Sequence, residues 1–483
     1  MGNKQTWGGE FRQNHLYKPF LRGALIIVLT VGCTLGAVNL AVMAFNADLS
    51  AVWSSLIQSH AYAQIFGWVG LFIMGMSYHM VPRFFLRPLK RPGLVLPSLL
   101  LVTSGILLRI ITQPLAGHPL AALAMVVSAL LGLCGVTLFV WAMGDTMLRG
   151  SDKYGPPLYV LYVGAGFVWF WLSSLATVLV TTYLAMNGLD SIPQSWDAPY
   201  LRGTLNGAIV TIVLGFTLRT VPQIMGTRPP IGWPIRAIFA AYTLAILLQV
   251  AGDSDWPAGA GTSLDLIGAM LEVTALMSFV ALLKLYNLGS IFSHRHNRHR
   301  KNAWPERFVR TAYFWLIVAA ALNFSYSLSA HLGQPVPHAF VASYHHALTV
   351  GFFSMMIVGM SMKLVPAFIG VMNKQPRLAG VVFILLVTGN TLRIACESMS
   401  YLYGGAFYLI MGLSGFIEVC ALGLYGVLLW RAMSLPSYGQ NSINGKKFKK
   451  FKKFERFIPL EPVQVAPPVQ QTAVGQSVPS RSH

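Results

Sequence analysis

The sequence predicts an all-α integral membrane protein with twelve transmembrane helices, on the strength of its composition, its apolar runs and its basic residues. Of the 483 residues, 55% are hydrophobic and only 10% are charged, and the mean hydropathy is +0.58. Soluble chains carry roughly a quarter charged residues, so this composition excludes an ordinary soluble protein. The apolar runs and the basic residues then give the number of spans and their direction.

Twelve apolar runs are long enough to cross a bilayer, which takes about 20 residues in a helix. The first run is too long for a cleavable signal peptide, so we interpret it as a spanning helix. The runs cover residues 20–45, 57–82, 93–114, 119–143, 157–186, 200–223, 233–252, 258–287, 308–331, 340–366, 378–401 and 404–431.

The basic residues divide the loops between the two sides of the membrane. Lys and Arg are retained on the cytoplasmic side, and with the N-terminus inside, only Arg109, Arg202 and Arg393 of the 35 basic residues fall toward the outer side. We therefore predict that both termini are cytoplasmic. The net charge of +20 then follows from the topology, and we expect no nucleic acid partner.

An internal repeat of about 140 residues becomes visible when three Val-Pro pairs are used as anchors. The anchors are Pro82, Pro222 and Pro366, each preceded by a glycine 7 residues earlier and by another 15 earlier. The residues 27 positions after them are Arg109, Gln249 and Arg393. We predict three units of four helices, 17–148, 155–288 and 307–434, around a pseudo-threefold axis.

A basic tail, 435–483, follows the third unit and contains three Lys-Lys-Phe triplets between Lys446 and Phe454. Each lysine near an anionic leaflet gains about 1 kcal/mol, and interleaved phenylalanines can enter the interface. We predict that the tail binds anionic membrane lipids, with a contact to a partner as the alternative.

Two histidines inside the predicted spans are the strongest candidates for a functional site, because ionisable groups are costly there. His60 and His346 lie 22 and 20 residues before their anchor prolines, which gives them matching depth near the outer boundary. Their two-residue offset turns them by about 200° on equivalent helices, as a planar ligand between the first and third units requires. Two imidazoles are typical ligands of low-spin haem iron; hydrogen bonding between helices is the alternative.

Arg109 and Arg393 occupy equivalent places in the first and third units, close to the level of the histidines. Haem propionates are anions that need cationic partners, so both arginines are candidates for that role. The alternative is that Arg393 pairs with Glu397, one turn later, while Arg109 extends its side chain toward the membrane surface.

The second and tenth helices resemble those of a known family. HAYAQIFGWVGLFIMGMSYHMVPRF and YHHALTVGFFSMMIVGMSMKLVP look like the catalytic subunit, subunit I, of haem-copper oxidases, which includes cytochrome c oxidases and bacterial nitric oxide reductases. The phrase HHALTVG also resembles the NnrS family, which is associated with nitric oxide stress. The likeness extends to about residue 434 and implies twelve helices in three four-helix arcs.

This resemblance implies a role for particular residues. His60 matches the low-spin haem ligand of the second helix, and His346 matches its partner on the tenth, with His345 as the substitute if the register shifts by one. The ligand of the high-spin haem falls on Tyr344, and the copper ligand of the sixth helix falls on Arg202. The seventh helix offers no histidine, so we expect no copper site.

The sequence therefore predicts a multi-pass haem protein of the bacterial inner membrane, with a low-spin haem b bound by His60 and His346, that serves electron transfer, respiration or a nitric-oxide-related function. Whether it is an enzyme stays open. One alternative is a functional oxidase or nitric oxide reductase with a rearranged centre that recruits His331, His338 and His345. The other is a twelve-helix transporter. A cytochrome c or another redox subunit is a candidate partner.

Overall fold

The computed structural model describes residues 15–85, 87–148, 158–253, 259–286, 304–370 and 375–435. Every regular element within these ranges is helical, and twelve helices are long and apolar enough to cross a membrane. The predicted multi-pass, all-α fold with twelve spans is therefore confirmed. The basic tail beyond residue 435 lies outside the described residues.

The bounds of the helices follow the predicted runs closely. The sixth span differs most, because it begins at Gln194 instead of residue 200; its first turns contain Asp197 and Pro199 and therefore do not form an apolar run. The spans are α2, η1 and α3 (Tyr17–Ile27, Val28–Gly32, Cys33–Asn46); α4, η2 and α5 (Ser54–Tyr62, Ala63–Gly70, Leu71–Phe84); α6 (Val95–Thr112) with short 3-10 turns at both ends; α7 (Pro119–Leu148); α8 (Leu158–Asn187); α9, η5 and α10 (Gln194–Arg202, Gly203–Val210, Thr211–Met225); α11 (Trp233–Gly252); α12 (Ala260–Leu283); α14 (Trp304–His331); α15, η7 and α16 (His338–His346, Ala347–Ser354, Met355–Phe368); α17 (Pro376–Tyr403); and α18 (Ala406–Ser434).

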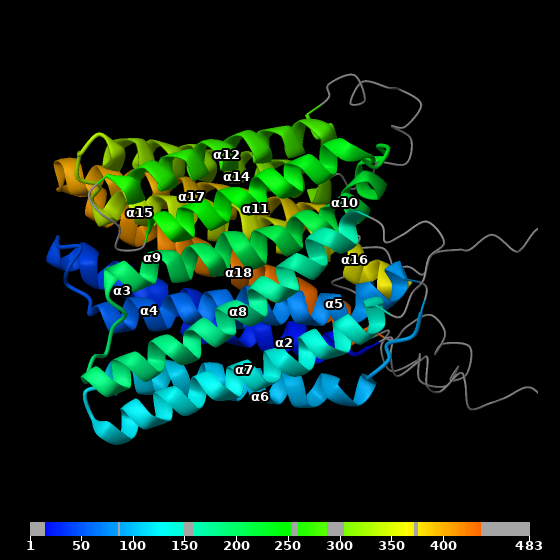
Figure 1. Ribbon diagram of the computed structural model, residues 1–483, viewed down its shortest axis with the longest axis horizontal. Helices are drawn as coiled ribbons and strands as arrows, with labels where there is room; N and C mark the ends of the chain where they lie inside the picture. Colours follow the sequence, from blue (N-terminus) through cyan, green and yellow to red (C-terminus); the bar gives the residue numbers. More distant parts are fainter. Residues whose placement is uncertain are drawn as a thin grey trace, which may run out of the picture.

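The helices lie side by side along the long axis of the molecule (Figure 1). Among the described residues, four spans contain a π-helical segment: η1 in the first span has five residues, and η2, η5 and η7 in the second, sixth and tenth spans have eight residues each. The first parts of the second, sixth and tenth spans, α4, α9 and α15, lie at one end of the bundle, which we call the histidine end, and α5, α10 and α16 lie at the opposite, proline end (Figure 1).

Nine helices enclose the other three. The fourth helix of each set of four packs on the first helix of the next set, α7 on α8 and α12 on α14, and α18 closes the ring on α3. The second, sixth and tenth spans lie inside: 100%, 72% and 72% of their central windows are buried, against 50% or less for the others. We refer to the three sets, 17–148, 158–283 and 304–434, as the first, second and third units.

Each inner helix packs through two glycines against the first helix of its own unit, where there is no room for a β-carbon. A Cβ on Gly67, Gly207 or Gly351 would lie within 2.7 Å of Ile27, Trp169 or Trp315, and one on Gly75, Gly215 or Gly359 within 2.9 Å of Phe20, Tyr162 or Phe308. In every unit the two opposing side chains are seven residues apart. Small residues allow this close approach of backbones in membranes, so the three units share one mode of packing.

Candidate functional site

The three eight-residue π-helical segments, η2, η5 and η7, stand at the same place in the repeat. Each has eight residues and begins 19 residues before its proline, at Ala63, Gly203 and Ala347. A π-helical turn accommodates extra residues relative to an α-helix and is frequent at functional sites. The candidate ligands lie just before these segments, so equivalent side chains from the three units end up at one level of the bundle.

Pairs of side chains meet at this level wherever two units adjoin. At each interface, the residue 20 positions before the anchor proline of one unit faces the residue 22 positions before the anchor proline of another unit. The two side chains are close enough to interact electrostatically. The pairs are His346 with His60 at the first–third interface, Arg202 with Tyr344 at the second–third interface, and Tyr62 with Tyr200 at the first–second interface. The histidine pair is thus one of three equivalent pairs, and only this one is made of two imidazoles.

A backbone carbonyl of the first span holds the imidazole of His60. Nδ1 of His60 lies 3.0 Å from the carbonyl oxygen of Gly32, a residue whose ψ of −108° interrupts the helix between η1 and α3. A carbonyl oxygen can only accept, so Nδ1 carries the proton and the lone pair of a neutral ring is on Nε2. A hydrogen bond of this kind on the second nitrogen is common for histidines that bind metals.

Gly36 lies against the same ring. A β-carbon at Gly36 would be 2.5 Å from Cε1 of His60 and 2.9 Å from Nε2, closer than side-chain atoms approach one another. The glycine therefore provides the space in which the imidazole lies flat against α3. Gly32 and Gly36, one helical turn apart, fix its orientation together.

His346 lies opposite, on α15. Its Nδ1 is buried and has no hydrogen-bond partner among the described residues, and its electrostatic partners are Arg393, His60 and His345. Those of His345 are His338 and Arg202, so His345 faces the second–third interface. The structure therefore places His346, and not His345, beside His60.

The two helices that carry these histidines are tied together one layer deeper. Nε1 of Trp68, in η2, donates a hydrogen bond of 3.1 Å to Oγ of Ser354, in η7. Both side chains are buried. Even so, His60 and His346 keep accessible surface, although their spans are among the most enclosed in the bundle. Both imidazoles are therefore only partly covered by the protein.

Arg393 interacts electrostatically with both histidines and forms the ion pair with Glu397. Nη2 of Arg393 is 3.0 Å from Oε1 of Glu397, while its Nε and Nη1 are buried without partners in the described structure. Both side-chain atoms of Asn390, one turn earlier on α17, are also buried and unpaired there. Unpaired buried polar atoms are rare, so the two free nitrogens of Arg393 are available to a ligand near the histidines.

Arg109 is placed elsewhere. It lies at the first–second interface, where its Nε donates to Oε1 of Gln113 at 2.8 Å and its guanidinium lies 5.5 Å from the ring of Tyr62. Its electrostatic partners are Tyr62 and Tyr200. With 2% of its surface exposed, it is buried and does not extend toward the membrane surface, and the structure does not bring it to the histidine pair.

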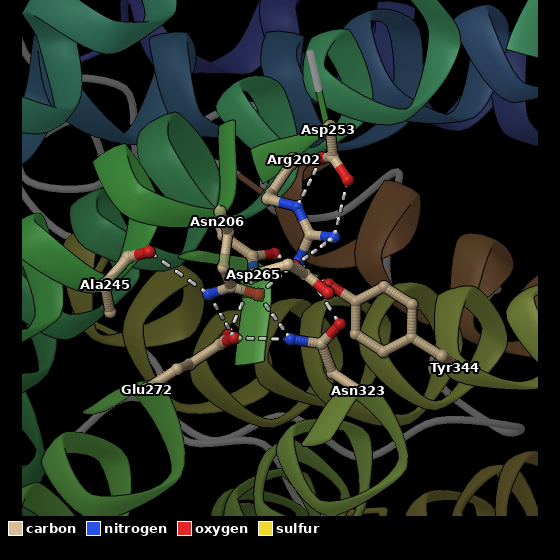
Figure 2. Close-up of polar contacts among 9 residues, drawn as sticks. Arg202, Asn206, Ala245, Asp253, Asp265, Glu272, Asn323 and Tyr344 are labelled. Atoms are coloured by element: carbon tan, nitrogen blue, oxygen red, sulfur yellow. Dashed lines mark hydrogen bonds and ion pairs between the residues drawn. The ribbon is translucent and has the colours of Figure 1, made fainter. Parts of the chain in front are cut away.

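A network around Arg202 fills the second–third interface (Figure 2). The guanidinium is bound in bidentate fashion by Asp253, at 2.7 and 3.2 Å, and pairs with Asp265 at 3.2 Å. It also donates to the side-chain oxygens of Gln249 and Asn323. Two carboxylates and two side-chain amides, from α11 and its C-cap, from α12 and from α14, therefore converge on this arginine of α9.

Glu272 lies at the deeper end of this network. We call Arg202, Asp253, Asp265, Gln249, Asn323 and Glu272 the Arg202 cluster. The carboxylate of Glu272 accepts hydrogen bonds from Asn206 at 2.8 Å, Gln249 at 3.1 Å and Asn323 at 2.8 Å. Tyr344 joins through a hydroxyl that donates to Oδ1 of Asn206 at 3.1 Å (Figure 2). The positions equivalent to the histidine pair thus hold an ion-paired network here.

His331 and His338, candidates for a rearranged centre, are exposed at the histidine end. Within the described ranges, no three His, Cys, Asp or Glu side chains are arranged as a metal site. The Arg202 cluster itself was not foreseen, although Glu272 and Glu418 occupy matching places in the repeat and could have indicated buried carboxylates at two interfaces.

The comparisons with known proteins bear on the fold. No protein-family model and no curated protein matches the chain. Among solved structures, it resembles a haem-copper terminal oxidase dimer determined by cryo-electron microscopy, with a TM-score of 0.66 over 88% of this chain and 85% of that chain. The chain has the haem-copper oxidase fold. At 11% identity, this likeness concerns the fold, and the chemistry has to be argued from the residues.

The threefold repeat of the chain explains why three equivalent interfaces exist in it, and the residues at each interface decide what it can hold. In this protein one interface carries a pair of histidines, another a network of charges, and the last a pair of tyrosines with a buried arginine. The resemblance to the NnrS family stays a prediction from HHALTVG.

Proposed function

We propose that the protein is a membrane haem protein in which His60 and His346 bind a low-spin haem b at the first–third interface, for electron transfer or a nitric-oxide-related function. The observation that carries the proposal is the placement of His346 beside His60 with the Nδ1 proton of His60 fixed on Gly32. A haem iron with two imidazole ligands would supply a one-electron carrier.

The surrounding residues fit such a group. Gly32 and Gly36 set the orientation of the His60 ring, and Nδ1 of His346 is buried with no partner in the described structure. The two unpaired nitrogens of Arg393, Nε and Nη1, can each donate a hydrogen bond to a propionate oxygen. The ion pair with Glu397 holds the guanidinium in place for that role.

The side of the membrane follows from the basic residues. With both termini in the cytoplasm of a bacterium, the histidine end faces the periplasm. An electron donor such as a cytochrome c or another redox subunit would then approach the protein from the periplasm. The Lys-Lys-Phe tail would lie on the cytoplasmic side, where anionic lipid attracts it.

The test is a spectrum of the purified full-length protein combined with a pyridine haemochrome count. We expect one haem per chain and a reduced low-spin b-type spectrum that His60→Ala and His346→Ala each abolish, because six-coordinate low-spin iron needs both strong axial nitrogens. His345→Ala is the matched control, adjacent in sequence but facing the other interface, and should retain most of the spectrum.

Other outcomes identify the alternatives. Two haems with stoichiometric copper and turnover of oxygen or nitric oxide would replace the proposal with a rearranged oxidase. A chain that binds no haem would favour a transporter. A spectrum lost with His345→Ala but kept with His346→Ala would move the ligand by one residue.

A further inference from the structure

A buried arginine at the first–second interface has no counter-ion among the described residues, in contrast to its equivalent in the third unit. Arg109 and Arg393 occupy the same place in the repeat and are both at least nine-tenths buried. Arg393 pairs with Glu397, four residues later, and interacts with Glu418 on the next helix. The third unit thus surrounds its arginine with two carboxylates.

The first unit lacks both of these acids. Gln113 stands where the third unit has Glu397, and Gly132 stands where it has Glu418. Gln113 keeps the contact with the arginine but as a neutral amide, with Nε of Arg109 donating to its Oε1 at 2.8 Å. The chain has therefore kept a cation and replaced each of its two partners by an uncharged residue.

Among the residues that the structure describes, no other acid takes over this role. The electrostatic partners of Arg109 are the phenols of Tyr62 and Tyr200. Asp197 acts on Tyr200, and the hydroxyl of Tyr200 is bonded to Thr177 at 2.9 Å. One guanidinium nitrogen, Nη1, is buried with no hydrogen-bond partner in the described part of the chain.

The surroundings of Arg109 are enclosed and polar. Gln113 is fully buried and donates through Nε2 to Gln58 at 3.0 Å. Gln58 is in turn held by both backbone groups of Ile192, in the loop before α9, at 2.8 and 3.0 Å. This chain of contacts covers the arginine at the histidine end, and a charge in such a site is costly unless an opposite charge accompanies it.

We propose that Arg109 binds a monovalent anion at the first–second interface, through Nη1 and beside the phenol of Tyr62. The anion is either a small inorganic ion or a carboxylate of a bound cofactor, and in both cases it takes the place of Glu397 and Glu418 of the third unit. As a site for an inorganic ion it does not depend on the proposed haem at His60 and His346, whereas as a site for a cofactor carboxylate it rests on that proposal.

The experiment measures the thermal denaturation midpoint of the full-length protein while chloride replaces gluconate, which is too large for an enclosed site. A ligand that binds only the folded state raises the midpoint in a saturable manner. We expect such a rise for the wild type, and none for Arg109→Gln, which removes the cation.

Two further variants separate an anion site from a general salt effect. Gln113→Glu supplies the acid of the third unit with no change of shape, so it should raise the midpoint without chloride and abolish the response to it. Gly144→Ala is the matched control, twelve residues after Gly132 on α7. A β-carbon at Gly144 would meet no atom within 4 Å, and the variant should respond to chloride like the wild type.

Two measurements, the chloride response and the midpoint potential of the haem, distinguish the two possible sources of the anion. A chloride response that persists in His60→Ala shows that an inorganic ion suffices. If the wild-type holoprotein gives no chloride response, but Arg109→Gln shifts the midpoint potential of the haem and Gln113→Glu shifts it too, the anion is a cofactor carboxylate. Equal chloride responses in the wild type and Arg109→Gln, or no response with an unchanged potential, would overturn the proposal.

Discussion

At the scale of single residues, equivalent positions of the repeat carry different chemistry. His60, Tyr200 and Tyr344 stand 22 residues before the three prolines, and Tyr62, Arg202 and His346 stand 20 residues before them. Each interface takes one residue from each set. A single substitution therefore alters one interface and leaves the other two unchanged.

The sequence predicted those residues whose partners are given by counting along the chain. His60, His346 and the pair of Arg393 with Glu397 can be found from distances to the prolines, since depth in a helix follows from residue number. The Arg202 cluster could not be found in this way. Asp253, Asp265 and Asn323 come from three other spans, and which of them meet depends on the rotation of each helix about its own axis.

The Arg202 cluster leads to a prediction about stability. Arg202→Met should lower the free energy of unfolding by about 3–5 kcal/mol, because it leaves Asp253 and Asp265 in the bundle without their cation. The measurement is equilibrium unfolding in mixed micelles. Arg219→Met on α10 is the matched control, since Arg219 is exposed and changes at such positions usually stay within about 0.5 kcal/mol. Equal losses in the two variants would contradict the prediction.

At the scale of elements, the π-helical segments distinguish the structure from the predicted continuous helices. Hydrophobic periodicity does not reveal them, because the inner helices are apolar on nearly all sides and one extra residue in a turn leaves no gap in such a pattern. They nonetheless determine the direction in which the candidate ligands of each inner helix face. One additional residue rotates the histidine end of a helix by about 100° relative to its proline end.

The contact between α3 and α4 leads to the second prediction. Gly36→Ala should displace the His60 imidazole, since the new methyl would lie 2.5 Å from Cε1, and haem content should fall while the protein still folds. The comparison is Gly23→Ala on α2 in the same span, where the nearest side-chain atoms are 3.7 and 4.0 Å away. Haem content is read from the pyridine haemochrome; a full complement of haem in Gly36→Ala would show that the ring binds elsewhere.

At the scale of the whole molecule, the sequence was sufficient for the number of spans and for the class of fold. Length and hydrophobicity alone define a spanning segment, and the repeat of glycines reflects the packing of each inner helix on its neighbour. The threefold arrangement of interfaces also follows from the order of the helices. What each interface binds does not, because it depends on a few side chains.

The topology is the third prediction. Reporter fusions after Asp190 should show the periplasm, and fusions after Gln440 should show the cytoplasm, because the basic residues favour that orientation. A periplasmic signal from the C-terminal fusion would reverse the assignment of the histidine end.

The basic tail leads to a further prediction. Deletion of residues 444–483 should preserve haem content while weakening association with anionic vesicles, which can be measured by flotation.

The three eight-residue π-helical segments, η2, η5 and η7, also separate the geometry of the sites from their chemistry. They share their length and their distance from the prolines in all three units, whereas the side chains beside them differ and include imidazole, guanidinium and phenol. The backbone therefore offers the same side-chain positions at each interface. The side chains at those positions, and not the backbone, make the three interfaces chemically different.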